Sequence, residues 1–301
     1  EGLMKMRGKI SSVILRVVMY ASAGFTAAAL LFILGYILAK GIPNLASPGL
    51  FAWKYTSDNV SLVPAAINTL MLVALALVMS IPFGIGSAIY LTEYAKKGNK
   101  FVSIIRVTTE TLSGIPSIIY GLFGMLFFVT ALKWQYSILA GAATVAIMVL
   151  PTIMRTTEEA LLAVPDSFRE ASLALGAGKL RTIFKIVLPS AMPGILSGVI
   201  LAIGRMVGET AALLYTSGAV ASVAKGVMSP GRTLAIHMYT ISSEAFHTNQ
   251  TFATAVVLLV IVFILNALAS FVALHLSMYL QAFCCSVARR FVFVFRSLCS
   301  P

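Results

Sequence analysis

"REASLALGAGKLRTIFKIVLP", residues Arg169 to Pro189, is a charged, glycine-punctuated stretch that separates two long apolar runs of the chain. Its pattern predicts a short amphipathic helix that stops at the glycines, followed by a second amphipathic segment that ends at Pro189. The first helix places Phe168, Ala171 and Leu175 on one side. Helices of this kind lie on a lipid surface or dock into a groove on a partner, and periodicity alone does not choose between the two.

The Gly178-Lys179 pair in this stretch resembles the end of a nucleotide-binding loop. Such a loop has the pattern G-x-x-x-x-G-K-[ST], in which backbone amides hold the phosphates, the lysine reaches them and the hydroxyl binds magnesium. Here Leu180 replaces the hydroxyl residue and Leu173 replaces the first glycine. The motif fails at both ends, so we expect this chain to bind no ATP or magnesium cofactor of its own.

The composition is that of an integral membrane protein. With 59% hydrophobic residues, 11% charged residues and a mean hydropathy of +0.96, the chain has too little polar surface to cover a soluble globule. A membrane helix needs about 20 apolar residues, and no alternation typical of a β-barrel is visible. We therefore predict an all-α integral membrane fold with about six transmembrane helices. They lie at Val13–Leu38, Ala65–Leu91, Leu112–Leu132, Tyr136–Met154, Met192–Tyr215 and Phe252–Leu276.

The third run contains "SGIPSIIYGLFG", in which Gly114, Pro116, Gly121 and Gly124 disfavour a straight helix. Broken backbone at membrane depth is tolerated only against protein or a water-filled cavity. The glycines therefore indicate either close helix packing or part of a transport pathway, and the sequence leaves both open.

Lysine and arginine residues predict the orientation, because cytoplasmic loops carry an excess of them. With the amino terminus inside, 16 of the 22 basic residues fall in inner segments, five fall in outer segments and Arg205 lies within a span. Both termini are thus predicted to be cytoplasmic, and the net charge of +12 indicates topology and contact with anionic membrane lipid. These charges are dispersed over several short loops, which argues against nucleic-acid binding. The basic start and Ala21-Ser22-Ala23 also fit a signal peptide, but the apolar run continues well past that point.

A motif in the opening stretch resembles the E-A-A…G…I-x-L-P signature of ABC importer permeases. Glu170-Ala171-Ser172 is followed by Gly176 and by I-V-L-P ending at Pro189, with serine in place of the third small residue. In that family this loop is the coupling helix, which sits in a cleft on the cytoplasmic ATPase subunit. Small Ala171 and Ser172 would permit close approach, Glu170 would supply a polar anchor, and Gly176 would permit a sharp turn.

The fifth run narrows the resemblance to the phosphate-specific ABC importer permeases. "LAIGRMVGETAALLYTSG" (201–218) resembles these permeases, and its G-E-T-A-A-L-L-Y-T most resembles the second of their two related permease subunits. The likeness covers roughly residues 68–266 and fails after the sixth span. The same family is matched by "YLTEYAKKG" (90–98), "IPSIIYGLFG" (115–124) and "PTIMRTTEEALLAVPDSFREASLALGA" (151–177).

The resemblance implies a type I ABC importer permease core over residues 65–276, including a coupling loop at 155–190. Residues 1–64 form an amino-terminal segment with the first helix and an outer loop, and residues 277–301 form an atypical tail. The implied activity is import of inorganic phosphate across a bacterial or archaeal cytoplasmic membrane. Its implied partners are a homologous second permease subunit, two cytoplasmic ABC ATPase subunits that use ATP and Mg, and an extracytoplasmic phosphate-binding protein. No catalytic residue is expected in this chain.

Arg205 and Glu209 are candidates on chemical grounds alone. They are four residues apart and would share one helical face, within an apolar run where a lone charge costs about 2.5–3.5 kcal/mol. Arg205 would attract a phosphate oxyanion, and Glu209 would orient it and limit the affinity so that the anion is released. The adjacent Thr210 belongs to the same candidate pathway. Alternatively, the two charges form a structural pair that only helps insertion.

Two other classes of function compete with this prediction. An ion-coupled secondary carrier would use Glu209 as a proton or cation site and would need no docking loop. A membrane enzyme would need a convergent nucleophile, base and metal ligands, which the sequence lacks. An ABC permease for another oxyanion is a closer alternative.

The remaining polar and thiol residues predict no site. His237, Glu244 and His247 match no zinc motif and are expected to be solvated, and no metal site is predicted. Cys284, Cys285 and Cys299 lie in the tail, where we expect reduced thiols.

Overall fold

The computed structural model describes residues 2–47, 49–56, 59–96, 98–244 and 248–298. Over these residues the chain is helical and contains no strand. Five helices are long and apolar enough to cross a membrane, or six if one sharply bent pair is a single span. The predicted all-α membrane fold is therefore confirmed. The long helices are α1 (Gly2–Gly41), α2 (Val63–Ile89), α5 (Ile138–Leu162), α8 (Leu188–Val207) and α11 (Thr248–Leu298).

Small residues bring the central helices together. In α5, which lies between α2 and α8, most of the apolar stretch is buried. A Cβ added to Gly84 of α2 would lie 2.7 Å from Ile153 of α5, and one added to Gly194 of α8 would lie 2.6 Å from Ala160. Such close backbone approach is how helices pack where lipid removes the hydrophobic driving force.

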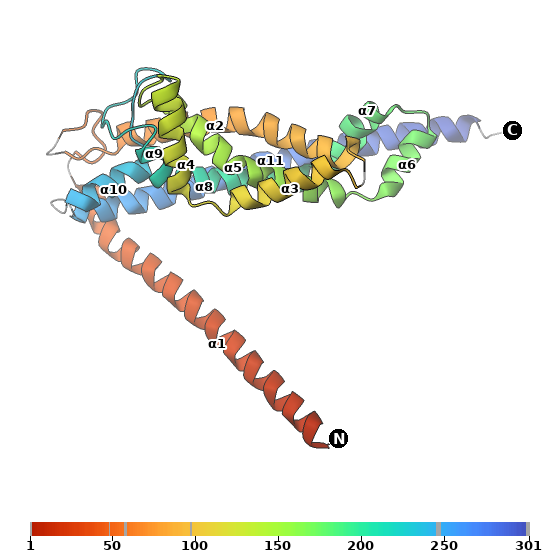
Figure 1. Cartoon of the computed structure of the whole chain (residues 1–301), viewed down its shortest axis with the longest axis horizontal. Helices are drawn as coiled ribbons and strands as arrows, with labels where there is room; N and C mark the ends of the chain where they lie inside the picture. Colours follow the sequence, from red (N-terminus) through yellow and green to blue (C-terminus); the bar gives the residue numbers. More distant parts are fainter. Residues whose placement is uncertain (1, 48, 57–58, 97, 245–247, 299–301) are drawn as a thin grey trace.

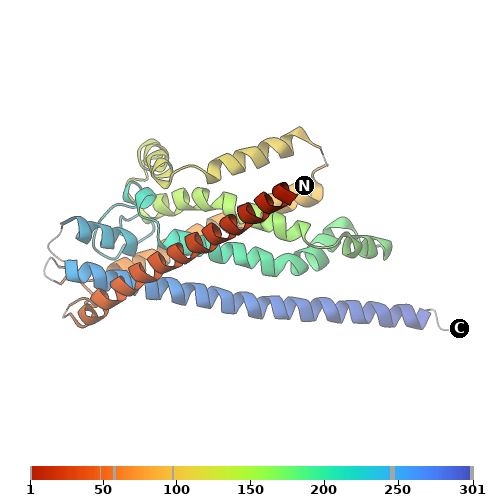
Figure 2. The ribbon, with the colours of Figure 1, turned by 90° about the horizontal axis from the view of Figure 1, so that it is seen from below.

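Helix α1 leaves the bundle at an angle, whereas α11 runs along it (Figures 1 and 2). Only the carboxyl end of α1 is anchored: Tyr36 packs edge-on against Phe252 of α11, and Gly41 contacts the same residue. No residue in the apolar window of α1 is buried, so this helix offers its apolar surface to lipid or to another subunit. Traced back from Gly41, α1 extends toward the end of the bundle that carries α6 and α7, as α11 does (Figure 1).

The predicted start of the third span is wrong, whereas the predicted break within it is present. Helix α3 already begins at Lys100 and runs to Ser113, and α4 (Ser117–Gly124) follows after a bend of 102°. A π-helical segment, η3 (Met125–Ala131), continues α4. The bend falls on Gly114–Pro116, because a proline ring has no N–H to continue the first helix.

The two later glycines of this region serve close packing. A Cβ on Gly121 would lie 2.8 Å from the Cα of Ala212, and one on Gly124 would overlap the side chain of Thr144. The hydroxyl of Tyr120 donates a 2.7 Å hydrogen bond to the Leu112 carbonyl, which ties α4 back to α3 across the bend. Helix packing therefore explains Gly121 and Gly124.

The fifth predicted span also differs at both ends. Helix α7 (Lys179–Thr182), the π-helical η4 (Ile183–Val187) and α8 are continuous, so Pro189 does not end the second segment of the opening stretch. The wide π turn just before Pro189 makes room for its ring, which would otherwise clash with a carbonyl one turn earlier. At the other end, α8 stops at Val207.

Candidate functional site

Arg205 and Glu209 do not share a helical face. Arg205 lies in the last turn of α8, Gly208 ends that helix, and the short helix α9 (Ala211–Leu214) begins after Thr210. The Glu209 carboxylate turns toward α9, where it accepts a 3.1 Å hydrogen bond from the backbone N–H of Ala212. The prediction of a shared face is therefore wrong, because the chain leaves the helix between the two residues.

The two residues also differ in their surroundings. Glu209 is only 9% exposed, whereas Arg205 lies on an open stripe of α8 together with Leu201 and Gly208. In the part of the chain that the structure describes, no carboxylate lies within ion-pair distance of Arg205. A self-neutralising pair is thus not formed, and the guanidinium charge faces outward from the bundle.

Residues shortly after Arg205 in the sequence line one surface cavity, and Leu201, shortly before it, lines another. Thr210, with Ala211 and Leu214, lines a cavity of about 530 Å³ between α9, α11 and α10 (Leu234–Glu244). One turn before Arg205, Leu201 lines a second groove of about 580 Å³ between α3, α5 and α8. Most of the residues that line this second groove are polar or charged, and we call it the polar groove. Its charged lining residues are Arg106, Glu110, Arg155, Glu158 and Glu159.

The basic residues of the polar groove are neutralised by neighbouring acids. Arg106 forms an ion pair with Glu158, and Arg155 pairs with Glu159 one turn later at 3.2 Å. An anion that enters this groove therefore meets cations whose charge is already compensated.

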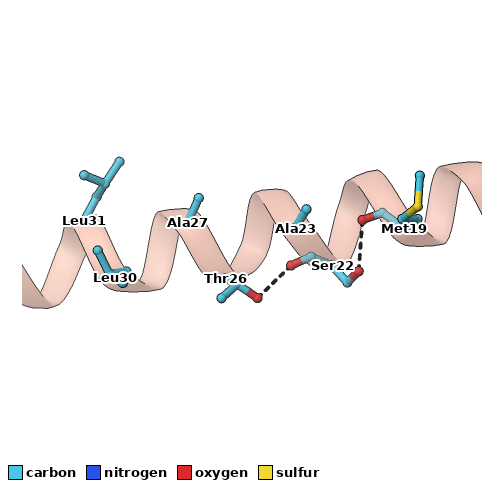
Figure 3. A pocket seen from close by; sticks show the side chains of 7 residues that line it. All are labelled: Met19, Ser22, Ala23, Thr26, Ala27, Leu30 and Leu31. Carbon is cyan, nitrogen blue, oxygen red and sulfur yellow. Dashed lines mark hydrogen bonds between the residues drawn. The ribbon is translucent and has the colours of Figure 1, made fainter. Parts of the chain in front are cut away.

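A third hollow, of about 730 Å³, lies along α1 and has the features of a packing surface (Figure 3). Its polar side chains are bonded to their own helix: Ser22 donates to the Met19 carbonyl at 3.0 Å and Thr26 donates to the Ser22 carbonyl at 2.9 Å. Figure 3 shows these bonds running along the ribbon. The hydroxyl donors of Ser22 and Thr26 are thus used within α1.

The predicted coupling loop has the expected helix and stop. Helix α6 (Asp166–Ala174) is followed by Gly176, whose φ of +79° is left-handed and favours glycine. Glu170 and Ala171 are exposed, as a docking surface requires. Ser172 is not part of that surface: it is 4% exposed, and its hydroxyl shares a 2.8 Å hydrogen bond with the Thr182 hydroxyl. The small serine therefore braces α6 against α7.

Large apolar side chains surround this loop on the surface. All of them are at least half exposed. Leu180 and Phe184 lie within the candidate span Lys179–Val207, whereas the other three lie outside the candidate spans. Exposed apolar clusters of this kind mark contact sites for other proteins. They are Phe168, Leu173, Leu175, Leu180 and Phe184.

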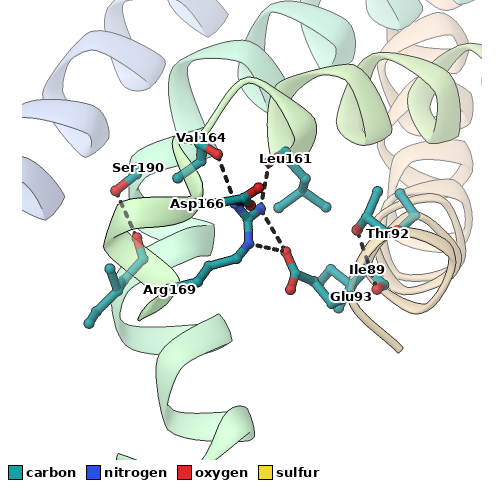
Figure 4. A network of polar contacts seen from close by, with 10 residues as sticks. Ile89, Thr92, Glu93, Leu161, Val164, Asp166, Arg169 and Ser190 are labelled. Carbon is teal, nitrogen blue, oxygen red and sulfur yellow. Dashed lines mark hydrogen bonds and ion pairs between the residues drawn. The ribbon is translucent and has the colours of Figure 1, made fainter. Parts of the chain in front are cut away.

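Sequence reasoning missed an ion pair beneath the loop, between Arg169 of α6 and Glu93. Glu93 lies in the π-helical turn η2 (Tyr90–Tyr94) at the end of α2. Its carboxylate accepts hydrogen bonds of 3.0 and 2.8 Å from Arg169, which Figure 4 shows at the centre of a polar network. Both residues were visible in the sequence, but 76 positions separate them and no local pattern connects them.

The expectation that His237 is solvated is wrong. His237 is fully buried in α10, outside the candidate spans, and its ring meets Tyr55 edge-on at 6.1 Å. Burial lowers the pKa of His237 to about 3, and the nearby charge of Arg232 acts in the same direction. Arg232 itself is 4% exposed and lies 4.3 Å from the centre of the Tyr55 ring.

Among the described residues no cluster of His, Cys, Asp or Glu has metal-binding geometry. The other candidates of this kind lie outside the description: His247 and Cys299 entirely, and Glu244, Cys284 and Cys285 in their side chains.

Comparison with known proteins places these features in a family. Residues 80–278 match the family model described as "Binding-protein-dependent transport system inner membrane component". The chain belongs to this family. It is thus a permease subunit of an ABC importer and a multi-pass membrane protein. The family match ends at residue 278, near the point where the likeness in sequence fails.

The permease has relatives of similar length. It is 33% identical over 242 residues to the probable ABC transporter permease YqgI of Bacillus subtilis, covering 74% of this chain and 80% of the relative. It is 34% identical over 238 residues to the phosphate transport system permease PstA of Haemophilus influenzae, covering 78% and 83%. With PstA 1 of Mycobacterium tuberculosis (H37Rv) it shares 36% over 211 residues, covering 69% and 68%.

Solved structures show the same fold. A bacterial ABC transporter involved in alginate import aligns with a TM-score of 0.58 at 15% identity, covering 83% of this permease and 95% of that chain. The inward-facing MetNI methionine ABC transporter aligns with a TM-score of 0.55 at 18% identity, covering 81% and 97%. The predicted type I ABC importer permease core is thereby confirmed.

Proposed function

We propose that this permease carries inorganic phosphate inward across a bacterial or archaeal cytoplasmic membrane, with both termini on the cytoplasmic side. Similarity to PstA phosphate transport permeases supports this substrate. The observation that carries the proposal is the exposed Arg205 charge, unpaired within the described chain and located at the end of a membrane helix. A positive charge that no carboxylate satisfies is what a desolvated oxyanion requires.

Arg205 contacts the anion in this proposal, and Glu209 acts indirectly. The guanidinium remains protonated and offers two parallel N–H donors to phosphate oxygens. Glu209 caps α9 and thereby holds the Gly208–Thr210 turn that ends the helix of Arg205. Thr210 lines the cavity on the far side of that turn, and its hydroxyl, which donates a long 3.5 Å hydrogen bond to the Gly208 carbonyl, would turn to donate to an entering anion.

Release toward the cytoplasm follows from the polar groove next to Leu201. Its two arginines are paired with Glu158 and Glu159, and Glu110 adds a third carboxylate, so this groove does not retain an anion. We assign the missing wall of the pathway to a homologous second permease subunit, because the Arg205 stripe is open on the surface of this chain.

Energy comes from two cytoplasmic ABC ATPase subunits that bind ATP and Mg, and an extracytoplasmic phosphate-binding protein delivers the substrate. The apolar surface around Phe168 and Leu175, together with exposed Glu170 and Ala171, fits a groove on an ATPase subunit. A secondary carrier that used Glu209 as its ion site is disfavoured, because this carboxylate is engaged by the backbone of Ala212.

The test has two stages. Purification from native membranes, with identification of every subunit, establishes the partners. The complex is then reconstituted into vesicles, and labelled phosphate uptake is measured with ATP, with a non-hydrolysable analogue, and with an ion gradient alone. Uptake only with hydrolysable ATP supports the proposal, and uptake driven by the gradient alone contradicts it. Competition by arsenate and sulfate tests whether the substrate is phosphate or another tetrahedral oxyanion. This test is needed because the name of the B. subtilis relative YqgI specifies no substrate.

A further inference from the structure

Arg169 joins three segments of the chain at the base of the coupling loop. Its guanidinium donates five hydrogen bonds, which use all five of its N–H groups. Two go to Glu93 Oε1, at 3.0 Å from Nε and 2.8 Å from Nη2. The others reach the carbonyls of Leu161 and Val164, at 2.9 and 2.7 Å, and Asp166 Oδ1 at 3.0 Å. Figure 4 shows the end of α5, the start of α6 and the end of α2 meeting at this one side chain.

The two partners of the central ion pair are well shielded from solvent. The side chain of Arg169 is 18% exposed and that of Glu93 is 9% exposed, whereas Asp166 on the same guanidinium is 81% exposed. A shielded, hydrogen-bonded ion pair holds one geometry, and loss of either partner leaves an uncompensated charge. An exposed pair such as Arg169–Asp166 contributes little.

A second contact reaches the same turn of α2 from the other half of the loop. The ammonium of Lys179, the first residue of α7, lies 4.9 Å from the centre of the Tyr94 ring. Helices α6 and α7 are braced against each other by the Ser172–Thr182 hydrogen bond. Side chains from both helices of the loop therefore contact η2.

These side-chain contacts are important because α2 is not directly adjacent to the loop in the sequence. Helix α6 follows α5 after a short turn, and α7 runs without a break into α8, so a displaced loop pulls on α5 and α8 through the backbone. Only side-chain contacts connect the loop to α2. Leu91 of η2 also belongs to the same buried apolar cluster as Ile183 and Val187, and apolar packing of this kind is not directional.

We propose that Glu93 and Arg169 are positioning residues that make α2 move together with the coupling loop. In this inference η2 is the point at which ATPase-driven displacement enters the helix bundle. A π-helical turn is consistent with this role, because such turns are frequently found at functional sites. The inference rests on the proposed ATP-driven import, and it adds a mechanical role for two shielded residues to which the proposed function assigns no contact with the substrate or the ATPase.

The experiment compares two isosteric changes at the same guanidinium. Glu93→Gln removes the shielded charge, and Asp166→Asn removes the exposed one and serves as the matched control. The complete transporter with each variant is reconstituted into vesicles, and phosphate taken up per ATP hydrolysed is measured at equal amounts of assembled complex. We expect this ratio to fall about tenfold in Glu93→Gln, equivalent to about 1.4 kcal/mol of coupling free energy, and to stay within twofold of the parent in Asp166→Asn. Glu93→Asp, which keeps the charge, should recover part of the loss.

A second measurement does not depend on the substrate. Hydrogen–deuterium exchange of the complex is followed with and without a trapped ATP analogue, in segments 90–94 and 166–176. In the parent we expect both segments to respond to the nucleotide, and in Glu93→Gln only segment 166–176.

The outcomes separate this inference from the phosphate assignment. If the parent complex takes up no phosphate, the proposed substrate is wrong, and the exchange measurement still decides the role of Glu93. If segment 90–94 of Glu93→Gln responds as in the parent, or if the transport ratio is unchanged while only the amount of complex falls, the ion pair is merely structural and the inference is overturned.

Discussion

Glu209 lies four residues after Arg205, yet its carboxylate caps the next helix instead of pairing with the arginine. The hydrogen bond from the Ala212 N–H, 3.1 Å long, holds Glu209 in a buried position, and Gly208 ends α8 between the two residues. The positive charge at the end of α8 is therefore left for another group, and the two residues have separate roles that mutation can distinguish.

Arg205→Gln should reduce phosphate uptake at least about tenfold, since a hydrogen bond to a charged group contributes about 1.5–3 kcal/mol and the amide lacks the charge. Arg205→Lys should recover only part of the activity, because a single ammonium lacks the planar fork. Labelled uptake is compared at matched amounts of assembled complex. The double variant Arg205→Gln with Glu209→Gln tests the rival structural pair: parental uptake in the double variant would reject the anion role.

Glu209→Ala should lower the free energy of unfolding by about 1 kcal/mol through loss of the cap on α9. Glu209→Gln keeps an oxygen that accepts from the Ala212 N–H, so its stability should stay near that of the parent. Thermal unfolding of the purified complex in detergent measures both variants. Equal destabilisation by alanine and glutamine would show that the charge, and not the hydrogen bond, is what the fold requires.

Gly176→Ala should weaken the coupling loop, because a Cβ at a φ of +79° costs about 1–2 kcal/mol. Gly178→Ala is the matched control: Gly178 lies two residues away, has a φ of −68°, and has open space where a Cβ would stand. We expect Gly176→Ala to reduce the ATPase subunit retained on purification and Gly178→Ala to leave it unchanged. The same loss in both variants would point to the loop surface instead of its backbone conformation.

Ala171→Trp should leave the permease folded, since Ala171 is exposed, but should prevent the ATPase subunit from seating on α6. Insertion, ATPase co-purification and uptake are measured together. Normal uptake with normal stimulated ATPase activity would reject this face of α6 as the docking surface.

The buried His237 predicts an acid-sensitive fold. Its pKa is about 3 in the folded chain and near 6.5 when unfolded, so between these values only the unfolded state binds the proton. The stability contributed by neutral His237 is therefore complete above about pH 6.5 and is lost as the pH falls toward 3. Thermal midpoints between pH 4 and 8 should fall less steeply on acidification in His237→Gln than in the parent. Parallel curves would mean that another group titrates.

Membrane class, helical content and the coupling motif follow from the sequence alone. Apolar runs of about 20 residues are a local property that the bilayer demands of each helix separately. The E-A-S and I-V-L-P motif is local too, and so are Gly114 and Pro116, which break a helix wherever they occur. Both the all-α fold and the bend in the third span were predictable for this reason.

Only the tertiary structure decided where the charges point and which segments they join. Gly208 is a local stop signal, but apolar residues continue beyond it, so the sequence alone did not decide that α8 ends there. The burial of Ala212 and Leu213 and the hydrogen bond from the Ala212 N–H to Glu209 accompany this end in the folded chain. The Glu93–Arg169 pair joins residues 76 positions apart, and the inward turn of Ser172 depends on Thr182 in the next helix. Such contacts depend on how helices pack in three dimensions, whereas a sequence pattern reports only the period within one helix.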